Sequence, residues 1–284
     1  MLSENQRLRV TTGITYTAVL DFSRETVLYL ARLMEAERRA RGTRRATRRL
    51  GPFRQAVLVL RWLLDNTRIA QLAADNGISG RTCHRYVLEG IAVLKAQAPT
   101  LEQAIERAKA AGHTHVMLDG TLIDTDRCRV PGPSVGVDLW WSGKHKRHGG
   151  NIQVLSAPDG FPLWTSPVRP GREHDMTCAR TRGLLTALDA TAADGLVPIA
   201  DTGYEAHRPP SACPTRSPPA ANSPPTQRQF NKAIGAIRAL AEKANADLKT
   251  RFKALRHVSL SPQRIGDITA AALAIFHFEK GRTA

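Results

Sequence analysis

Apolar residues in the first part of the chain recur at helical spacing. Val27, Leu30 and Met34 mark one face of a predicted helix over residues 22–36. Pro52 opens a second segment with the same rhythm, since proline is tolerated in the first turn of a helix. Two further helical patterns follow toward the end of this region, over residues 87–94 and 101–111. We therefore predict that residues 1–112 form an all-helical domain.

Residues 67–87 have the pattern of a helix-turn-helix. Thr67 is expected to cap a short first helix, and Asn76-Gly77 to supply a left-handed turn. Ile78 would fill the gap between the helices, and Ser79 would cap the second helix. The second helix would present four polar side chains to DNA: Arg81, Thr82, His84 and Arg85. The alternative interpretation is an ordinary antiparallel helix pair.

The pattern changes to strands and turns after Gly112. Residues 115–118 form an apolar run that leads into Asp119-Gly120, and residues 197–200 lead in the same way into Asp201. Both runs predict buried strands that end in a carboxylate. Two such carboxylates on one sheet suit a divalent metal, because hard cations take oxygen ligands. A single aspartate at a strand end, in contrast, more often caps a turn.

The remaining elements complete an α/β unit. Residues 152–155 and 161–167 predict a hairpin around Pro158-Asp159-Gly160. Helices are expected from His174 to about Leu188, from Arg228 to Leu255, and over residues 265–278, where an apolar helix would cover the sheet. We assign residues 113–284 to this second domain.

The charge of the chain indicates a polyanionic partner. The formal net charge is +16 and the isoelectric point is about 10.5, which favours nucleic acid over a generic basic protein. Arginines concentrate between positions 38 and 49, where only Glu37 is a nearby acid. We predict that they contact DNA phosphates, although a solvated linker is the alternative. The predicted contacts are Arg38, Arg39, Arg44, Arg45, Arg48 and Arg49.

The cysteines and the hydropathy pattern favour a reducing compartment. The four cysteines lie far apart without a CxxC pair, which argues against a structural zinc site or a disulfide scaffold. The first residues contain no apolar signal core, and no run approaches the roughly 20 apolar residues of a membrane span. We expect a cytoplasmic, nucleoid-associated protein without a membrane partner.

Two further segments are unusual. The loop over residues 142–150 contains His145 and His148, but Lys144, Lys146 and Arg147 would repel a cation there. We interpret it as a loop that faces phosphate. Residues 206–227 contain seven prolines, so no regular element is expected there.

Several motifs together give the chain a family resemblance. They are Leu118-Asp119-Gly120-Thr121-Leu122-Ile123, Ser142-Gly143-Lys144-His145-Lys146-Arg147-His148, Pro170-Gly171-Arg172-Glu173-His174-Asp175, Ala200-Asp201-Thr202-Gly203-Tyr204, Ala241-Glu242-Lys243-Ala244-Asn245 and Leu248-Lys249-Thr250-Arg251-Phe252. With these motifs the chain resembles bacterial insertion-sequence transposases of the DDE type, in the branch related to Harbinger transposases. The resemblance extends over nearly the whole chain.

The resemblance implies an α/β, RNase H-like catalytic core behind the helix-turn-helix. Asp119, Asp201 and Glu242 would be the three catalytic acids and would hold two Mg²⁺ or Mn²⁺ ions about 3.5–4 Å apart. Without the family, Glu242 would be interpreted as a solvated helix acid. Three other carboxylates compete for the role and rank lower: Asp124, Asp126 and Asp138.

The implied activity is DNA transposition. The protein would bind terminal inverted repeats and target DNA as a homodimer, and would catalyse metal-dependent cleavage and strand transfer. Lys144, His148, His174 and Asp175 would contact the substrate or support the metal ligands. The alternatives are a catalytically impaired remnant, a DNA-binding regulator without catalysis, and a nuclease that cuts without joining.

The proline-rich segment departs from the family, which carries a glycine- and lysine-containing segment there. One codon choice for residues 220–226 encodes such a peptide in a shifted reading frame. We therefore hypothesise two compensating frameshifts around residues 206–227, which would impair this copy. The nucleotide sequence of the gene tests this hypothesis.

Overall fold

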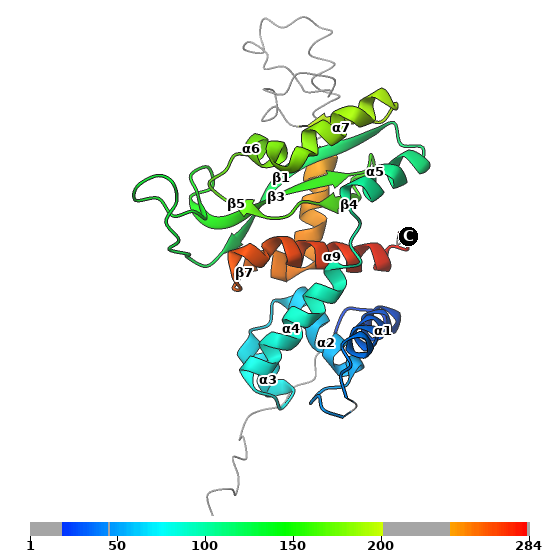
Figure 1. Ribbon diagram of the computed structural model, residues 1–284, viewed down its shortest axis with the longest axis vertical. Coiled ribbons are helices and arrows are strands. Elements are labelled where there is room, and N and C mark those ends of the chain that lie inside the picture. The colour runs from blue at the N-terminus through cyan, green and yellow to red at the C-terminus, as the bar shows by residue number, and fades with distance from the viewer. Residues whose placement is uncertain (1–18, 45, 201–238, 283–284) are drawn as a thin grey trace, which may run out of the picture.

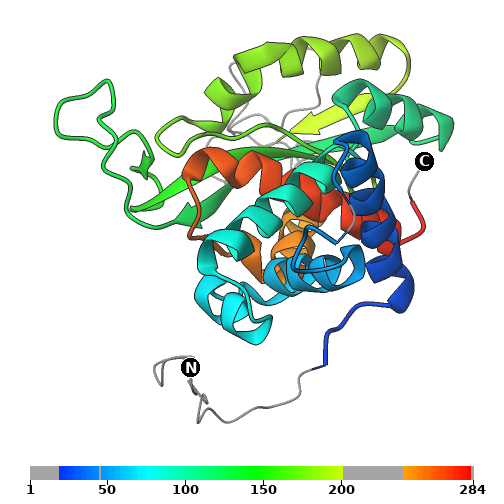
Figure 2. The same cartoon turned by 60° about the horizontal axis from the view of Figure 1, so that its bottom comes forward.

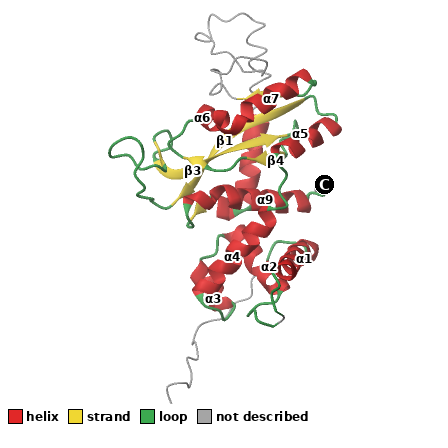
Figure 3. Ribbon diagram, in the orientation of Figure 1, coloured by secondary structure: helices red, strands yellow, loops and turns green. Residues whose placement is uncertain are grey.

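The computed structural model describes residues 19–44, 46–200 and 239–282, and these residues form a mixed structure of helices around one sheet. In Figure 1 the sheet lies between two groups of helices, with the N-terminal helices packed beyond one of them. Figure 3 shows the same arrangement by type of element. The expected mixture of α and β structure is therefore confirmed.

The sheet is built on β1 (His115–Thr125). On one side β1 pairs antiparallel with β3 (Arg147–Ser156), and on the other it pairs parallel with β6 (Val197–Ala200). Shorter strands extend these pairings: β2 (Trp141–Ser142), β4 (Pro162–Thr165) and β5 (Arg169–Pro170) on β3, and β7 (His257–Val258) on β1. The predicted hairpin of β3 and β4 is confirmed, with Gly160 at a φ of 80° in its turn.

Asp119 lies inside β1, which corrects the expectation of a strand that ends at this residue. The strand continues because its second half keeps antiparallel partners on β3, including Leu122 opposite Asn151 and Asp124 opposite Gly149. Sequence periodicity missed this continuation, since Asp119, Gly120 and Thr121 interrupt the apolar run.

One face of the sheet is covered by α5 (Leu101–Ala110), α6 (Asp175–Arg180) and α7 (Leu184–Ala193). Leu118 and Leu155 face Ile105, Ala179 and Leu188 in one apolar cluster. The single helix predicted from His174 to Leu188 is wrong, because the chain breaks after α6 and turns at Gly183, where φ is 70°. His174 does begin the helical segment, as the N-cap of α6.

The other face is covered by the helix over residues 239–251 and by α9 (Ile265–Glu279). The predicted apolar helix over 265–278 is confirmed. The long helix predicted from Arg228 is described only from residue 239, and it ends at residue 251 before a short 3-10 turn (Lys253–Leu255). Within the described ranges, α9 included, no helix is both long and apolar enough to cross a membrane.

The N-terminal helices are α1 (Arg24–Ala40), α2 (Pro52–Asp65), α3 (Ile69–Asp75) and α4 (Gly80–Lys95). They pack beneath α9, as the turned view of Figure 2 shows. Leu30, Leu63 and Leu94 belong to the same apolar cluster as Phe252 and Ile268. The helical region therefore shares a core with the sheet rather than forming a separate body. The boundary at residue 112 stays a prediction, although α5, placed before it, packs on the sheet.

Candidate active site

Asp119 points from the centre of β1 toward the 239–251 helix. The Nδ2 atom of Asn245 donates a hydrogen bond of 2.8 Å to Oδ2 of Asp119. The helix approaches closely because small residues face the sheet, with Ala241 packed against Met117 and Ile199. Asn245 itself is only 8% exposed. The fold thus holds an aspartate and an amide together in a largely apolar environment.

Lys249 lies one turn further along the same helix. Its ammonium group donates hydrogen bonds of 2.7 Å to Oγ1 of Thr121 and 3.0 Å to the carbonyl oxygen of Leu122. Burial lowers the pKa of Lys249, and the carboxylates of Asp124 and Asp119 counteract this shift. A half-buried positive charge is therefore held beside β1, on the same face as Asp119.

The carbonyl oxygen of the Asn245 side chain fits a metal site. This Oδ1 atom is buried and, within residues 19–44, 46–200 and 239–282, has no hydrogen-bond partner. A buried unpaired acceptor is costly, and a carboxylate beside an amide oxygen is the donor set that Mg²⁺ and Mn²⁺ prefer. In the described part of the chain, no group of three or more His, Cys, Asp or Glu side chains is placed to hold a metal. Further ligands would have to come from residues 201–238 or from the substrate.

The structure describes two of the three predicted catalytic acids, Asp119 and Glu242. Glu242 is exposed and lies one helical turn before Asn245. Asp201 lies outside the described residues. Ala200, the residue before it in the chain, pairs with Leu118, the residue before Asp119. The convergence of the three acids stays a prediction.

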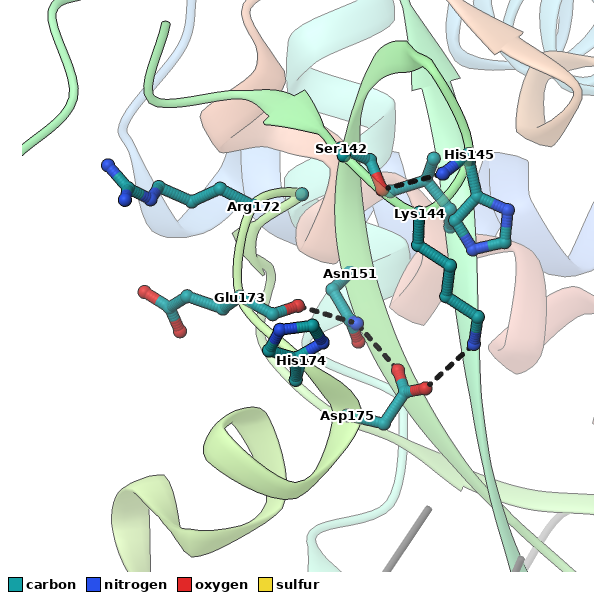
Figure 4. Close-up of a pocket in the computed structure, with 11 residues that line it drawn as sticks. Ser142, Lys144, His145, Asn151, Arg172, Glu173, His174 and Asp175 are labelled. Atoms are coloured by element: carbon teal, nitrogen blue, oxygen red, sulfur yellow. Dashed lines mark hydrogen bonds and ion pairs between the residues drawn. The ribbon is translucent and has the colours of Figure 1, made fainter. Parts of the chain in front are cut away.

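A polar pocket lies on the opposite face of β1 and β3. It has a volume of about 210 Å³, and Asp175 lies at its base. Nδ2 of Asn151 donates a hydrogen bond of 2.7 Å to Oδ1 of Asp175, and Nζ of Lys144 lies 3.5 Å from Oδ2 (Figure 4). A Cβ atom added to Gly120 would lie 2.3 Å from Oδ1 of Asp175. Gly120 and Asp119 are successive strand residues and face opposite sides, so the sheet separates Asp175 from Asp119.

The pocket gathers most of the predicted substrate residues. Lys144, His174 and Asp175 all line it, and so does His145. His148 is not among the lining residues. Its Nε2 atom lies 2.9 Å from Oδ2 of Asp138, and its ring contacts the edge of Trp141. Asp175 lies on the face of the sheet opposite the Asp119 side chain, and contact of these residues with substrate stays a prediction.

The carboxylates ranked below the triad have basic partners. Asp124 pairs with Arg147 at 2.6 Å, and Asp126 pairs with His257 at 2.7 Å. Asp138 pairs with His148. These partners compete with a cation for the same oxygens, which supports the lower rank.

Two helices, α3 and α4, occupy the segment predicted as a helix-turn-helix, and their role in DNA binding stays a prediction. The Ser79 hydroxyl accepts a hydrogen bond of 3.2 Å from the backbone N–H of Thr82, and Gly77 has a φ of 61°. Ile78 packs against the shared core. The cap predicted at Thr67 is wrong, because Arg68 is the N-cap of α3 and makes no side-chain cap bond. The three longer side chains are exposed: Arg81, His84 and Arg85.

The arginine run divides into internal and exposed members. Arg38 donates hydrogen bonds to the carbonyl oxygen of Leu50 and to Oε1 of Gln55, and Arg48 pairs with Glu89 at 2.8 Å. These two side chains are engaged in contacts within the fold, which argues against a phosphate contact for them. Exposed members remain available to DNA: Arg39, Arg44 and Arg49. Arg45 lies outside the described residues.

Sequence reasoning assigned no role to Asn245, Lys249 or Asn151. A signal was present for the first two, because Asn245 and Lys249 follow Glu242 at helical spacings of three and seven and so share its face. Asn151 gave no such signal, since its role depends on which strand lies beside β1.

The matches to known proteins identify the family. The family model described as DDE superfamily endonuclease matches residues 118–277, more than half of the chain. The chain therefore belongs to the DDE superfamily endonucleases. This region contains Asp119, Asn245 and Lys249, together with the pocket around Asp175.

Comparison with individual proteins adds little. No curated protein matches the chain. It is similar to the crystal structure of a pre-cleavage Mos1 transpososome, with 11% identity, 85% of this chain and 81% of that chain covered, and a TM-score of 0.19. The Mos1 strand transfer complex matches with 12% identity, coverage of 95% and 99%, and a TM-score of 0.23. TM-scores of this size support no argument about the fold.

Proposed function

We propose that the protein is a DDE transposase that binds the ends of a bacterial mobile element and catalyses DNA cleavage and strand transfer. The family membership and the position of Asp119 carry the proposal. Asp119 is held by Asn245 at the centre of the sheet, inside the region matched by the endonuclease family. The Harbinger-related branch and the bacterial origin follow from the sequence resemblance alone.

The proposed core is RNase H-like. The order of strands supports this, since the antiparallel set of β4, β3 and β1 continues into β6, which is parallel to β1. Asp119, Asp201 and Glu242 would hold two Mg²⁺ or Mn²⁺ ions. Such ions, when bound, lower the pKa of an attacking water or 3′-hydroxyl and stabilise the leaving oxygen of an in-line displacement.

The residues of the chain have distinct proposed tasks around this reaction. Asp119 supplies a carboxylate whose orientation is fixed by Asn245. Lys249 supplies a positive charge near the phosphodiester, and its bonds to β1 fix that charge in place before substrate arrives. Lys144 and His174, which line the pocket on the other face, would bind a DNA backbone outside the reacting phosphate.

DNA binding would begin at the N-terminal helices. The exposed Arg81, His84 and Arg85 on α4 support an entry of this helix into the major groove. Arg39, Arg44 and Arg49 would contact phosphates, and the net charge of +16 supports the same partner. We further propose a homodimer on DNA, because both element ends must be joined, and a cytoplasmic, nucleoid-associated location.

A DNA substrate with the inverted repeats that flank the gene tests the proposal. With Mg²⁺ we expect cleavage at the repeat end and joining of that end to a target, both lost in Asp119→Ala. Cleavage without joining would instead support a nuclease. Binding of the repeats without cleavage would support a non-catalytic DNA-binding protein or a remnant impaired by the proline-rich segment, and the gene sequence then tests the frameshift hypothesis.

A further inference from the structure

Asn245 and Asn151 make the same contact on opposite faces of one ladder. Each donates from Nδ2 to an aspartate, Asn245 to Asp119 at 2.8 Å and Asn151 to Asp175 at 2.7 Å. Both side chains are buried, at 8% and 6% exposure. Because the two Nδ2 bonds are alike, any difference between these asparagines lies in what their Oδ1 atoms contact.

The oxygens of the two amides differ. Oδ1 of Asn151 accepts a hydrogen bond of 2.8 Å from Nε2 of Gln153, so this amide is satisfied at both ends. Oδ1 of Asn245 is buried and finds no hydrogen-bond partner in the part of the chain that the structure describes. A buried polar atom without a partner costs about 1–3 kcal/mol, and such atoms are rare in folded proteins. The unpaired atom lies on the side chain that contacts Asp119.

The neighbours of Asn245 narrow the choice of partner. On its helix, Ala241, Ala244 and Leu248 are buried apolar residues that offer no donor. A donor on the same helical face, Nζ of Lys249, bonds to Thr121 and to the carbonyl oxygen of Leu122 instead. A cation shared with the carboxylate of Asp119 would satisfy the amide oxygen, since neutral amide oxygens are ordinary ligands of hard divalent metals.

We propose that Asn245 is a metal ligand, which uses Oδ1 to bind the same divalent cation as Asp119 while Nδ2 orients the Asp119 carboxylate. This inference rests on the proposed function, because it adds a ligand to the metal site of that reaction. Glu242 is exposed and Asn245, one turn later on the same helix, is buried and faces Asp119. A neutral ligand there adds an oxygen without a further negative charge beside Asp119.

Binding of Mn²⁺ alone to the full chain tests the inference without any DNA. Electron paramagnetic resonance or calorimetry gives the affinity for the wild type and for Asp119→Ala, Asn245→Ala, Asn245→Asp and Asn151→Ala. We expect Asp119→Ala to abolish the site and Asn245→Ala to weaken it by about tenfold or more. Asn245→Asp keeps an oxygen that can bind the metal, so this variant should bind Mn²⁺ at least as well as the wild type. Asn151→Ala, the matched control, should stay within about twofold.

Distinct results overturn the inference and the proposed function. If Asp119→Ala loses Mn²⁺ while Asn245→Ala keeps wild-type affinity, the amide is no ligand and the proposed function stands. If Asn245→Asp binds as poorly as Asn245→Ala, only the donated hydrogen bond matters and the ligand role is wrong. Equal loss in Asn151→Ala also overturns it. If Asp119→Ala binds like the wild type, the metal site of the proposed function itself is wrong. Cooperative thermal unfolding of each metal-free variant shows that it is folded.

Discussion

The two faces of the β1–β3 ladder carry the same three residue types in different states. On one face Asp119 contacts Asn245, and the half-buried Lys249 donates to the backbone of β1. On the other, Asp175 contacts Asn151, and the side chain of Lys144 is 65% exposed at the rim of a pocket. The first face is half-buried and, within the described residues, leaves the amide oxygen of Asn245 without a partner, whereas the second face pairs its groups and opens to solvent.

This difference indicates separate tasks for similar chemistry. Buried charges interact strongly and cannot rearrange, which suits a site where charge develops during a reaction. Exposed charges at a pocket rim are screened by salt and bind a flexible polyanion without fixing it. The comparison therefore supports the proposal of chemistry on the Asp119 face and substrate contact on the Asp175 face.

The largest expected effect separates the two aspartates. Asp119→Asn should lower the rate of Mg²⁺-dependent end cleavage by ~10³-fold, because removal of a metal-binding carboxylate forfeits several kcal/mol of charge stabilisation. Asp175→Asn should lower it by no more than about tenfold. Single-turnover cleavage of an end substrate measures both rates. Equal losses of cleavage rate in the two variants would contradict the proposal that only the Asp119 face carries the chemistry.

The next effect separates the two lysines by stability. Lys249→Met removes a charged donor from the Thr121 hydroxyl and the Leu122 carbonyl, and should lower the free energy of unfolding by about 2–3 kcal/mol. Lys144→Met, which removes one long and exposed ion pair, should cost less than about 1 kcal/mol. Urea unfolding monitored by circular dichroism measures both. A small loss for Lys249→Met would show that the bonds of Lys249 to Thr121 and Leu122 contribute little to the free energy of unfolding.

A smaller effect concerns Gly120, the strand residue between the faces. The Cβ atom of Gly120→Ala would clash with Oδ1 of Asp175, so this carboxylate must move and lose its bond from Asn151, at a cost of about 1–3 kcal/mol. A Cβ atom at Gly143, in the same pocket, would meet nothing within 4 Å, so Gly143→Ala is the matched control. Thermal unfolding compares the two variants. Equal stability would mean that Asp175 is free to move away.

The smallest expected effect is a pH dependence. Burial lowers the pKa of Lys249 in the folded protein below its ordinary value of 10.5. Between these two pKa values the unfolded chain holds more protons, so the contribution of this lysine to stability rises with pH. We expect the free energy of unfolding of the wild type, relative to Lys249→Met, to increase as the pH approaches 10.5. Urea unfolding of the metal-free proteins at several pH values measures this, and a decrease would contradict it.

Local patterns in the sequence predicted the elements well where a short-range signal defined them. The helices α1, α2, α4, α5 and α9 follow from their periodicity, and Ser79 and Gly77 were identified because caps and left-handed turns need particular side chains. The break at Gly183 was missed, since an isolated glycine in an apolar segment does not by itself end a helix.

The sequence by itself determined the mixed α/β class, the short helix pair α3 and α4 with the Gly77 turn and the Ser79 cap, and the apolar strand that contains Asp119, because periodicity and caps are local along the chain. Only the tertiary structure decided that Asp175 lies across the sheet from Asp119, that Arg38 and Arg48 bond within the fold, and that Asn245 faces Asp119. These facts depend on which segments pack together, and Asn245 meets a residue 126 positions away in the chain. No local pattern encodes such a distance, since it is set by the packing of a whole helix on a sheet.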